Sequence, residues 1–394
     1  MPAGKKVVQA GKGSGAGRLG PLIEQVRSLV QSARRTAAVS VNTLQVLTNF
    51  EIGRRIVEHE QKGAKRAEYG AEVLKELSAR LTAEFGKGFS ARNLEYMRKF
   101  FLTWKERFPE ISQMPFAKLP HSTNSQKPAN ESRIARQVTG QSVTIEISQQ
   151  AIAKLRSTFP LSWTHYLILL SIKDPGERSF YEIEAAAEGW SIPELKRQVA
   201  SSLYERLALS RNKKAVRKLA DEGQIIAKPE DILKEPYVLE FLGLDEKAGY
   251  SESELETAII NQIERFLLEL GKGFLFEARQ KRFTFDEDHY FVDLVFYNRL
   301  LRCYVLIDLK LDKLTHQDLG QMQMYVNYFD RHVKLPDEHR SIGILLCKRK
   351  KDAIVELTLP RDANVHAREY KLYLPSKEEL KRKLLEWAGE TGRE

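Results

Sequence analysis

The sequence predicts an all-α N-terminal domain of helix-turn-helix character and a C-terminal α/β (α+β) domain in which helices flank a central mixed sheet. Three observations predict this division. Apolar residues recur at helical spacing over about residues 21–104 and again over about 151–219. After Pro229 the pattern changes to one helix followed by alternating strand-like runs. A chain of 394 residues has room for roughly two or three such folding units.

Shifts in composition predict the domain limits. Residues 1–20 are rich in Gly and Lys and lack apolar periodicity, which predicts a flexible basic tail. The helical domain covers residues 21–229, and a linker or insertion rich in Pro, Ser, Asn and Gln interrupts it at about 105–149. The last domain covers residues 230–394.

The composition excludes several classes of protein. The longest apolar stretch, residues 166–172, is far shorter than the roughly 18 residues of a membrane span, so we expect no membrane partner and a cytoplasmic location. Cys303 and Cys347 have no neighbour at zinc-ligand spacing, and neither a zinc finger nor a disulfide scaffold is supported. A net charge of +10, from 63 basic and 53 acidic residues, favours a polyanionic partner. Whether the chain forms a homo-oligomer stays open.

Two helical pairs are candidates for reading DNA. In the first, glycines precede Ser90, a predicted helix N-cap, and the helix that follows carries Arg92, Arg98 and Lys99. In the second, Gly189 ends a helix and the next one starts with a capping box, SIPE, and carries basic residues, among them Lys196, Arg197 and Arg206. Either pair is a helix-turn-helix that enters a DNA groove, or an ordinary helical hairpin with a solvated basic face.

A basic cluster after the second pair is the stronger candidate for phosphate contacts, because five cations fall within eight residues. Its members are Arg211, Lys213, Lys214, Arg217 and Lys218.

The last domain contains the elements that carry the candidate site. We expect a helix at 253–270, strand-like runs at 274–285, 290–298 and 303–311, a helix at 315–332, and strands near 341–348 and 353–359. Short connections predict that the first three strands pair antiparallel.

Two aspartates are expected to meet on one face of this sheet. If the second hairpin turns between residues 300 and 301, Asp293 lies directly opposite Asp308. Like charges opposed in an apolar setting are unfavourable, and a divalent cation would relieve the repulsion. Hard oxygen ligands favour magnesium or manganese over zinc. Period-2 alternation places Lys310 on the same face as Asp308.

The neighbouring helices offer further candidates. Glu256 falls inside the apolar stripe of helix 253–270, whereas Glu264 sits at its edge and Glu269 on the opposite face, so Glu256 is the inward-pointing acid. It is a third site carboxylate or a first-turn acid that the helix dipole favours. Gln321 and Tyr325 share a face of the following helix, which is also compatible with ordinary amphipathic surface.

These residues resemble the PD-(D/E)XK nuclease superfamily, and specifically its YhcG-type family. The phrases YSESELE, FVDLVFYNRLLRCYVLIDLK and GQMQMYVNYFD resemble that family, and FGKGFSARNLEYMRKFF and WSIPELKRQVASSLYERL resemble its helical N-terminal domain. Val292 stands where the family name has proline. The resemblance implies a restriction-endonuclease-like fold with a site made of Glu256, Asp293, Asp308, Lys310, Gln321 and Tyr325.

The resemblance further implies Mg²⁺-dependent hydrolysis of phosphodiester bonds, with Mn²⁺ as a substitute. Asp293, Asp308 and Glu256 would hold the metal, and Lys310 would position the nucleophilic water or offset charge on the phosphoryl oxygens. DNA is the expected polymer. Gln280 is a weaker site candidate, because an ordinary cross-strand hydrogen bond explains it equally well. The alternative is a non-cleaving nucleic-acid-binding or scaffolding protein that uses a nuclease fold for docking.

Overall fold

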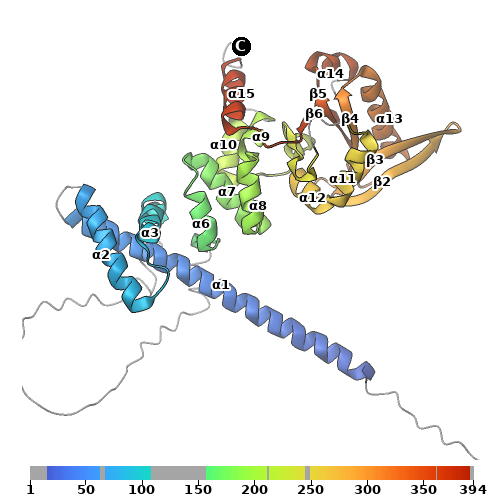
Figure 1. The fold of residues 1–394 in the computed structure, drawn as a ribbon. Helices are drawn as coiled ribbons and strands as arrows, with labels where there is room; N and C mark the ends of the chain where they lie inside the picture. The colour runs from blue at the N-terminus through green and yellow to red at the C-terminus, as the bar shows by residue number, and fades with distance from the viewer. Residues whose placement is uncertain are drawn as a thin grey trace, which may run out of the picture. The chain divides into compact units, whose positions relative to one another are not determined.

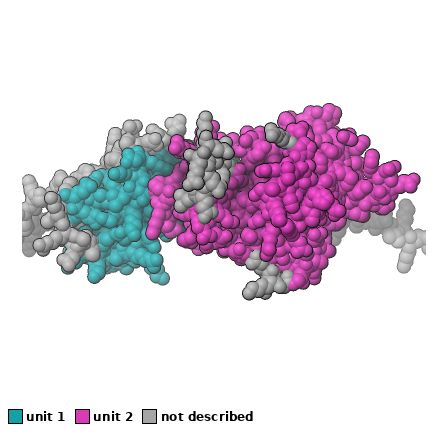
Figure 2. All heavy atoms as spheres, turned by 90° about the horizontal axis from the view of Figure 1, so that it is seen from above, with its two compact units in different colours: residues 1–170 teal, residues 171–394 magenta. Residues whose placement is uncertain are grey.

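The computed structural model describes residues 16–62, 67–107, 157–210, 213–244, 249–360 and 362–390. Contacts divide the chain into two compact units, residues 1–170 and 171–394, which Figure 2 shows in different colours. The predicted tail up to residue 15 and the predicted linker from residue 108 onward lie outside the described residues. Helix α1 begins at Ala16, so residues 16–20 of the predicted tail are helical.

The described part of the N-terminal unit is helical, as the sequence predicted. Its elements are α1 (Ala16–Lys62), α2 (Ala67–Phe85), α3 (Ala91–Trp104), the 3-10 turn η1 (Lys105–Arg107) and α6 (Trp163–Leu169). The side chain of Ser90 accepts a hydrogen bond from the backbone N–H of Asn93 and caps α3, which confirms the predicted N-cap.

Aromatic packing and one close backbone approach join α1 to α3. Phe100 on α3 contacts Phe50 on α1 and Phe159, with ring centroids 5.7 and 5.1 Å apart, and all three rings are buried. Gly53 on α1 lies against the backbone of α3, where a β-carbon would overlap the carbonyl oxygen of Met97. This helix contact therefore requires glycine at residue 53.

The C-terminal unit begins with four short helices: α7 (Pro175–Glu188), α8 (Ile192–Ala200), α9 (Leu203–Leu209) and α10 (Lys213–Glu222). Gly189 ends α7 in the left-handed conformation, at φ 65°, and Ser191 with Glu194 forms the predicted capping box of α8. Contacts group these helices with the sheet that follows, whereas the sequence analysis assigned them to the helical N-terminal domain.

A six-stranded mixed sheet forms the centre of this unit, which confirms the predicted α/β fold class. Its strands are β1 (Tyr237–Val238), β2 (Phe274–Phe285), β3 (Asp288–Asn298), β4 (Cys303–Lys313), β5 (Ile342–Arg349) and β6 (Val365–Lys371). The strand order is β1-β6-β5-β4-β3-β2. The predicted antiparallel pairing of β2 with β3 and of β3 with β4 is confirmed, and the other neighbours pair parallel.

Helices cover both faces of the sheet (Figure 1). On one face lie α11 (Glu252–Asn261) and α12 (Ile263–Leu270), packed on strand residues such as Ile307 and Leu309. On the other face lie α13 (His316–His332) and α14 (Asp352–Thr358), packed on residues such as Leu306. The remaining elements are η3 (Pro229–Ile232), η4 (Glu240–Leu242) and α15 (Lys377–Glu390).

Two predicted elements of this unit are wrong. The helix expected at 253–270 is broken at Gln262, where φ −121° and ψ 31° interrupt it, so two short helices replace one. The strand expected near 353–359 is the helix α14, and the final strand is β6. An apolar run of this length fits a strand or a helix equally well by periodicity, which explains the second error.

Within the described residues, no helix combines the length and the apolarity needed to cross a membrane.

Candidate active site

The β3–β4 hairpin brings Asp293 and Asp308 together. The pairing follows the predicted register, with Leu294 opposite Ile307 and Asn298 opposite Cys303, and Asp293 lies one step beyond this ladder. Instead of a backbone bridge at that step, an oxygen of the Asp293 carboxylate accepts a hydrogen bond of 2.9 Å from the backbone N–H of Leu309. The two carboxylates therefore lie at the place where β3 and β4 separate.

Asp308 is an almost fully buried carboxylate beside a second one. Its residue is 4% exposed. Burial, and next the charge of Asp293, raise the pKa of Asp308 to about 7. Lys310 Nζ lies 2.9 Å from Asp308 Oδ2, which confirms that the two side chains share a face. Burial lowers the pKa of Lys310, but the charge of Asp308 raises it. The net result is a pKa above the usual value for lysine.

Glu256 reaches this site through Gln280. Glu256 lies on α11 and is 3% exposed. The Gln280 amide nitrogen is 2.6 Å from a Glu256 carboxylate oxygen and 2.9 Å from Asp293 Oδ1, so one donor bridges the two acids. Arg279 forms an ion pair with the other oxygen of Glu256. Glu264 is exposed and has no part in this arrangement.

A left-handed backbone conformation at Gln280 determines where its side chain lies. The residue lies in β2 at φ 47°, a left-handed conformation that is rare for a residue other than glycine. The ladder on either side pairs Arg279 with Leu294 and Lys281 with Val292, so Gln280 stands beside Asp293. Sequence reasoning rated Gln280 as a weak candidate and missed Arg279. Extending the β2–β3 register from the turn at 286–287 would have placed Gln280 opposite Asp293.

Gln321 and Tyr325 border the same site from α13. The Gln321 amide donates a hydrogen bond to the hydroxyl of Tyr325, whose side chain is buried. Burial raises the pKa of Tyr325, and the carboxylates of Asp308 and Asp293 act in the same direction. Tyr325 packs in the same core cluster as Val292 and Leu306, which neighbour Asp293 and Asp308 in their strands.

The donor set suits a hard divalent cation. Asp293 and Asp308 supply carboxylate oxygens, and two neighbouring carboxylates, one of them almost fully buried, favour a positive charge between them. Glu256 is already held by Arg279 and Gln280. Accordingly, within the residues described, no three His, Cys, Asp or Glu side chains are grouped closely enough to form a metal site.

The structure places the predicted nucleic-acid-binding residues in different surroundings. On α3, Arg92 is exposed and lies over the ring of Tyr96, Lys99 is 55% exposed, and Arg98 pairs with Glu60 at 2.8 Å. The basic cluster is only partly described: Arg217 and Lys218 on α10 are exposed, Arg211 lies outside the described residues, and so do the side chains of Lys213 and Lys214.

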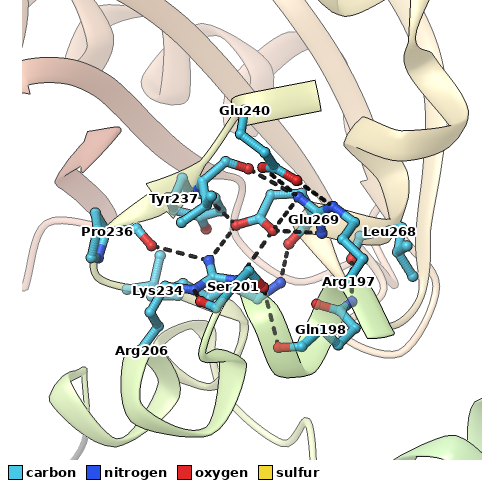
Figure 3. A network of polar contacts seen from close by, with 12 residues as sticks. Arg197, Gln198, Ser201, Arg206, Lys234, Pro236, Tyr237, Glu240, Leu268 and Glu269 are labelled. Carbon is cyan, nitrogen blue, oxygen red and sulfur yellow. Dashed lines mark hydrogen bonds and ion pairs between the residues drawn. The ribbon is translucent and has the colours of Figure 1, made fainter. Parts of the chain in front are cut away.

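Two arginines of the second candidate DNA-reading pair are instead part of a buried network (Figure 3). Arg206 forms an ion pair with Glu269 in which neither side chain is exposed. Arg197 lies 3.2 Å from the same carboxylate, which also accepts a hydrogen bond from the backbone N–H of Val238. Glu269 was expected on the outer face of its helix, and that expectation is wrong. Arg206 is likewise unavailable to DNA.

The fold and the site together define the class of the C-terminal unit. Its mixed sheet carries the D-x-K residues Asp308 and Lys310 next to Asp293, as in restriction-endonuclease-like domains of PD-(D/E)XK type. Residues 230–385 match the family model of the YhcG PDDEXK nuclease domain, and residues 25–206 match that of the DUF1016 N-terminal domain.

The chain belongs to the YhcG family. It is 42% identical over 353 residues to the protein named "Putative nuclease YhcG" from Escherichia coli (strain K12). This alignment covers 89% of this chain and 90% of that protein. A crystal structure of a repair endonuclease from Pyrococcus abyssi aligns with 33% of this chain and 50% of that chain, at 20% identity and a TM-score of 0.22. The two family models and the 42% identity confirm the resemblance inferred from the sequence.

Proposed function

We propose that the protein is a Mg²⁺-dependent nuclease that hydrolyses phosphodiester bonds, with DNA as its polymer and Mn²⁺ as a substitute metal. The observation that carries the proposal is the meeting of Asp293, Asp308 and Lys310 at one end of the β3–β4 hairpin, with Glu256 joined to Asp293 through Gln280. The net charge of +10 supports a polyanionic substrate, and the absence of apolar spans in the sequence supports a cytoplasmic location.

Asp293 and Asp308 would bind the cation, and Glu256 would complete or orient their shell. When bound, Mg²⁺ would supply a Lewis acid that lowers the pKa of a water nucleophile. Lys310 keeps its proton, because its pKa is raised, and can hold the water or offset negative charge on the phosphoryl oxygens.

Two further side chains complete the proposed roles. Gln321 and Tyr325, joined by their hydrogen bond on α13, would orient the substrate strand beside the buried carboxylates. Gln280 would hold Glu256 and Asp293 at a fixed separation, since its one amide nitrogen contacts both.

The test is cleavage of labelled single-stranded and double-stranded DNA and RNA by the full-length protein in Mg²⁺, in Mn²⁺ and in EDTA. We expect cleavage that requires the metal and falls by about 100-fold or more in Asp308→Asn. Asp312→Asn is the matched control, because Asp312 is an exposed aspartate of the same strand. If the wild-type protein cleaves none of these polymers, the nuclease proposal is wrong and the non-cleaving alternative stands.

A further inference from the structure

A pocket separate from the carboxylates lies where β2 ends beside α13 and α14. Its volume is about 350 Å³. This is within the roughly 300–1,000 Å³ of small-molecule sites. The residues that matter for its chemistry are Phe283, Phe285, Gln323, Asn327, Tyr328 and Arg331. The β2–β3 hairpin that supplies the two phenylalanines extends beyond the rest of the sheet (Figure 1).

An aromatic wall connects this pocket to the candidate active site. Phe283 stacks on Tyr328, with ring centroids 4.0 Å apart and planes inclined by 19°. The same ring meets the edge of Tyr325 at 5.5 Å. Phe283 and Tyr325 pack in one core cluster with Val292 and Leu306, which are one and two residues from Asp293 and Asp308 in their strands, so the pocket wall continues toward the carboxylates. Phe285, at the end of β2, is 59% exposed and adds an open ring face or edge to the lining.

Two amides of α13 give the pocket unused hydrogen-bonding capacity. The Gln323 amide nitrogen donates to Asn327 Oδ1 at 3.0 Å. Within the described ranges, no group donates a hydrogen bond to the buried Gln323 Oε1 atom. Among the described residues, nothing accepts a hydrogen bond from the Asn327 amide nitrogen. Each amide therefore keeps one group, the Gln323 oxygen and the Asn327 nitrogen, that can pair with the edge of a nucleobase, and a buried acceptor without a partner costs stability.

The charge around the pocket also suits a nucleotide. Arg331 lines it and, within the part of the chain that the structure describes, forms no ion pair with a carboxylate. The hairpin turn itself is acidic, since residues 286–288 read Asp-Glu-Asp, so a phosphate would approach from the α13 side.

We propose that this pocket receives one unpaired nucleobase of the substrate strand, next to the phosphodiester that the site cleaves. The proposal rests on the proposed nuclease function and deepens it, because it makes single-stranded or locally unpaired polynucleotide the substrate class. Aromatic rings stack on any base, and the amides of Gln323 and Asn327 contact its edge. Arg331 pairs with the adjoining phosphate. A base held in a fully paired duplex cannot enter unless it leaves the stack.

The experiment measures binding without cleavage. Fluorescence anisotropy in EDTA gives the affinity of the full-length protein for roughly twelve-nucleotide single-stranded DNA, the RNA of the same sequence, and the blunt DNA duplex. Gln323→Ala/Asn327→Ala removes the amides and Phe285→Ala removes an exposed ring. Phe291→Ala is the matched control, because Phe291 is an aromatic of the same hairpin, 45% exposed, outside the pocket lining.

We expect the wild-type protein to prefer a single strand to the duplex. The amide double variant and Phe285→Ala should each weaken single-strand binding by about tenfold, with duplex binding unchanged and Phe291→Ala like the wild type. The DNA and RNA arms show which polymer supplies the base. Three outcomes would overturn the proposal. They are equal affinity of the wild type for single strand and duplex, unchanged single-strand binding in both pocket variants, and a loss of single-strand affinity in Phe291→Ala as large as in those variants. If the wild type cleaves no polymer in Mg²⁺, the proposed nuclease function is wrong. The binding results still decide whether the pocket receives a base.

Discussion

Removing the guanidinium of Arg206 should strongly destabilise the C-terminal unit. Arg206 and Glu269 are both fully buried, and Arg206→Met leaves the Glu269 carboxylate with Arg197 and the backbone N–H of Val238 as its remaining partners. Breaking a buried ion pair from one side typically costs about 3–5 kcal/mol, because the remaining charge is left poorly solvated.

The pKa of Glu269 gives a second estimate of the free energy that this network contributes to folding. Burial alone would raise the pKa of Glu269, but Arg206, Lys234 and Arg197 outweigh it and hold the pKa at about 2 instead of 4.5. A depression of this size corresponds to about 3 kcal/mol of folding free energy. Since the folded pKa is the lower one, this stabilisation is complete above about pH 4.5 and is lost as the pH falls toward 2.

The assay measures urea unfolding at pH 7, with hydrogen exchange and mass spectrometry as the readout. This readout separates peptides of α9 and α12 from peptides of the N-terminal unit. Arg302→Met is the matched control, because Arg302 pairs with Asp337 in an exposed ion pair and should change stability by less than about 1 kcal/mol. A loss in Arg206→Met no larger than that of the control would refute the assignment of Glu269 as a charge that depends on Arg206.

Three further predictions concern the proposed activity. Without metal, Asp308→Asn should leave the melting temperature unchanged or raised, because it removes one of two neighbouring charges; a clear fall in calorimetry would contradict this. Glu256→Gln should lose cleavage and weaken Mn²⁺ binding, whereas Glu264→Gln, altered at an exposed position, should change both only slightly in parallel cleavage and metal titrations; the reverse ranking would exclude Glu256 from the site. Arg217→Gln/Lys218→Gln should reduce the slope of log affinity against log salt by about 1–2, and an unchanged slope would place the phosphate contacts elsewhere.

The sequence was most informative where local patterns determine geometry. Alternation and a short turn predicted the β3–β4 register, and the structure pairs Leu294 with Ile307 as expected. Capping residues predicted helix starts at Ser90 and Ser191, and both side chains cap their helices. The D-x-K spacing put Asp308 and Lys310 on one face for the same reason, since successive strand residues alternate between faces.

The sequence failed where the decisive partner lies far along the chain. Helix phase at 100° per residue placed Glu269 outside, but the break at Gln262 resets that phase. The arginine that neutralises Glu269 is 63 residues away, and no local pattern reveals it. Gln280 was underrated for a related reason, because its role depends on a left-handed backbone in the middle of a strand.

The buried Arg206–Glu269 pair also limits how this protein can be recombined. The family model of the N-terminal domain ends at residue 206 and that of the nuclease domain begins at residue 230, so the two charges fall on opposite sides of the apparent seam. A gene fusion made at that seam would give the nuclease domain a buried glutamate without its arginine. We therefore expect a viable fusion to keep residues 171–394, which contain both charges, in one piece, and relatives that replace Glu269 to replace Arg206 as well.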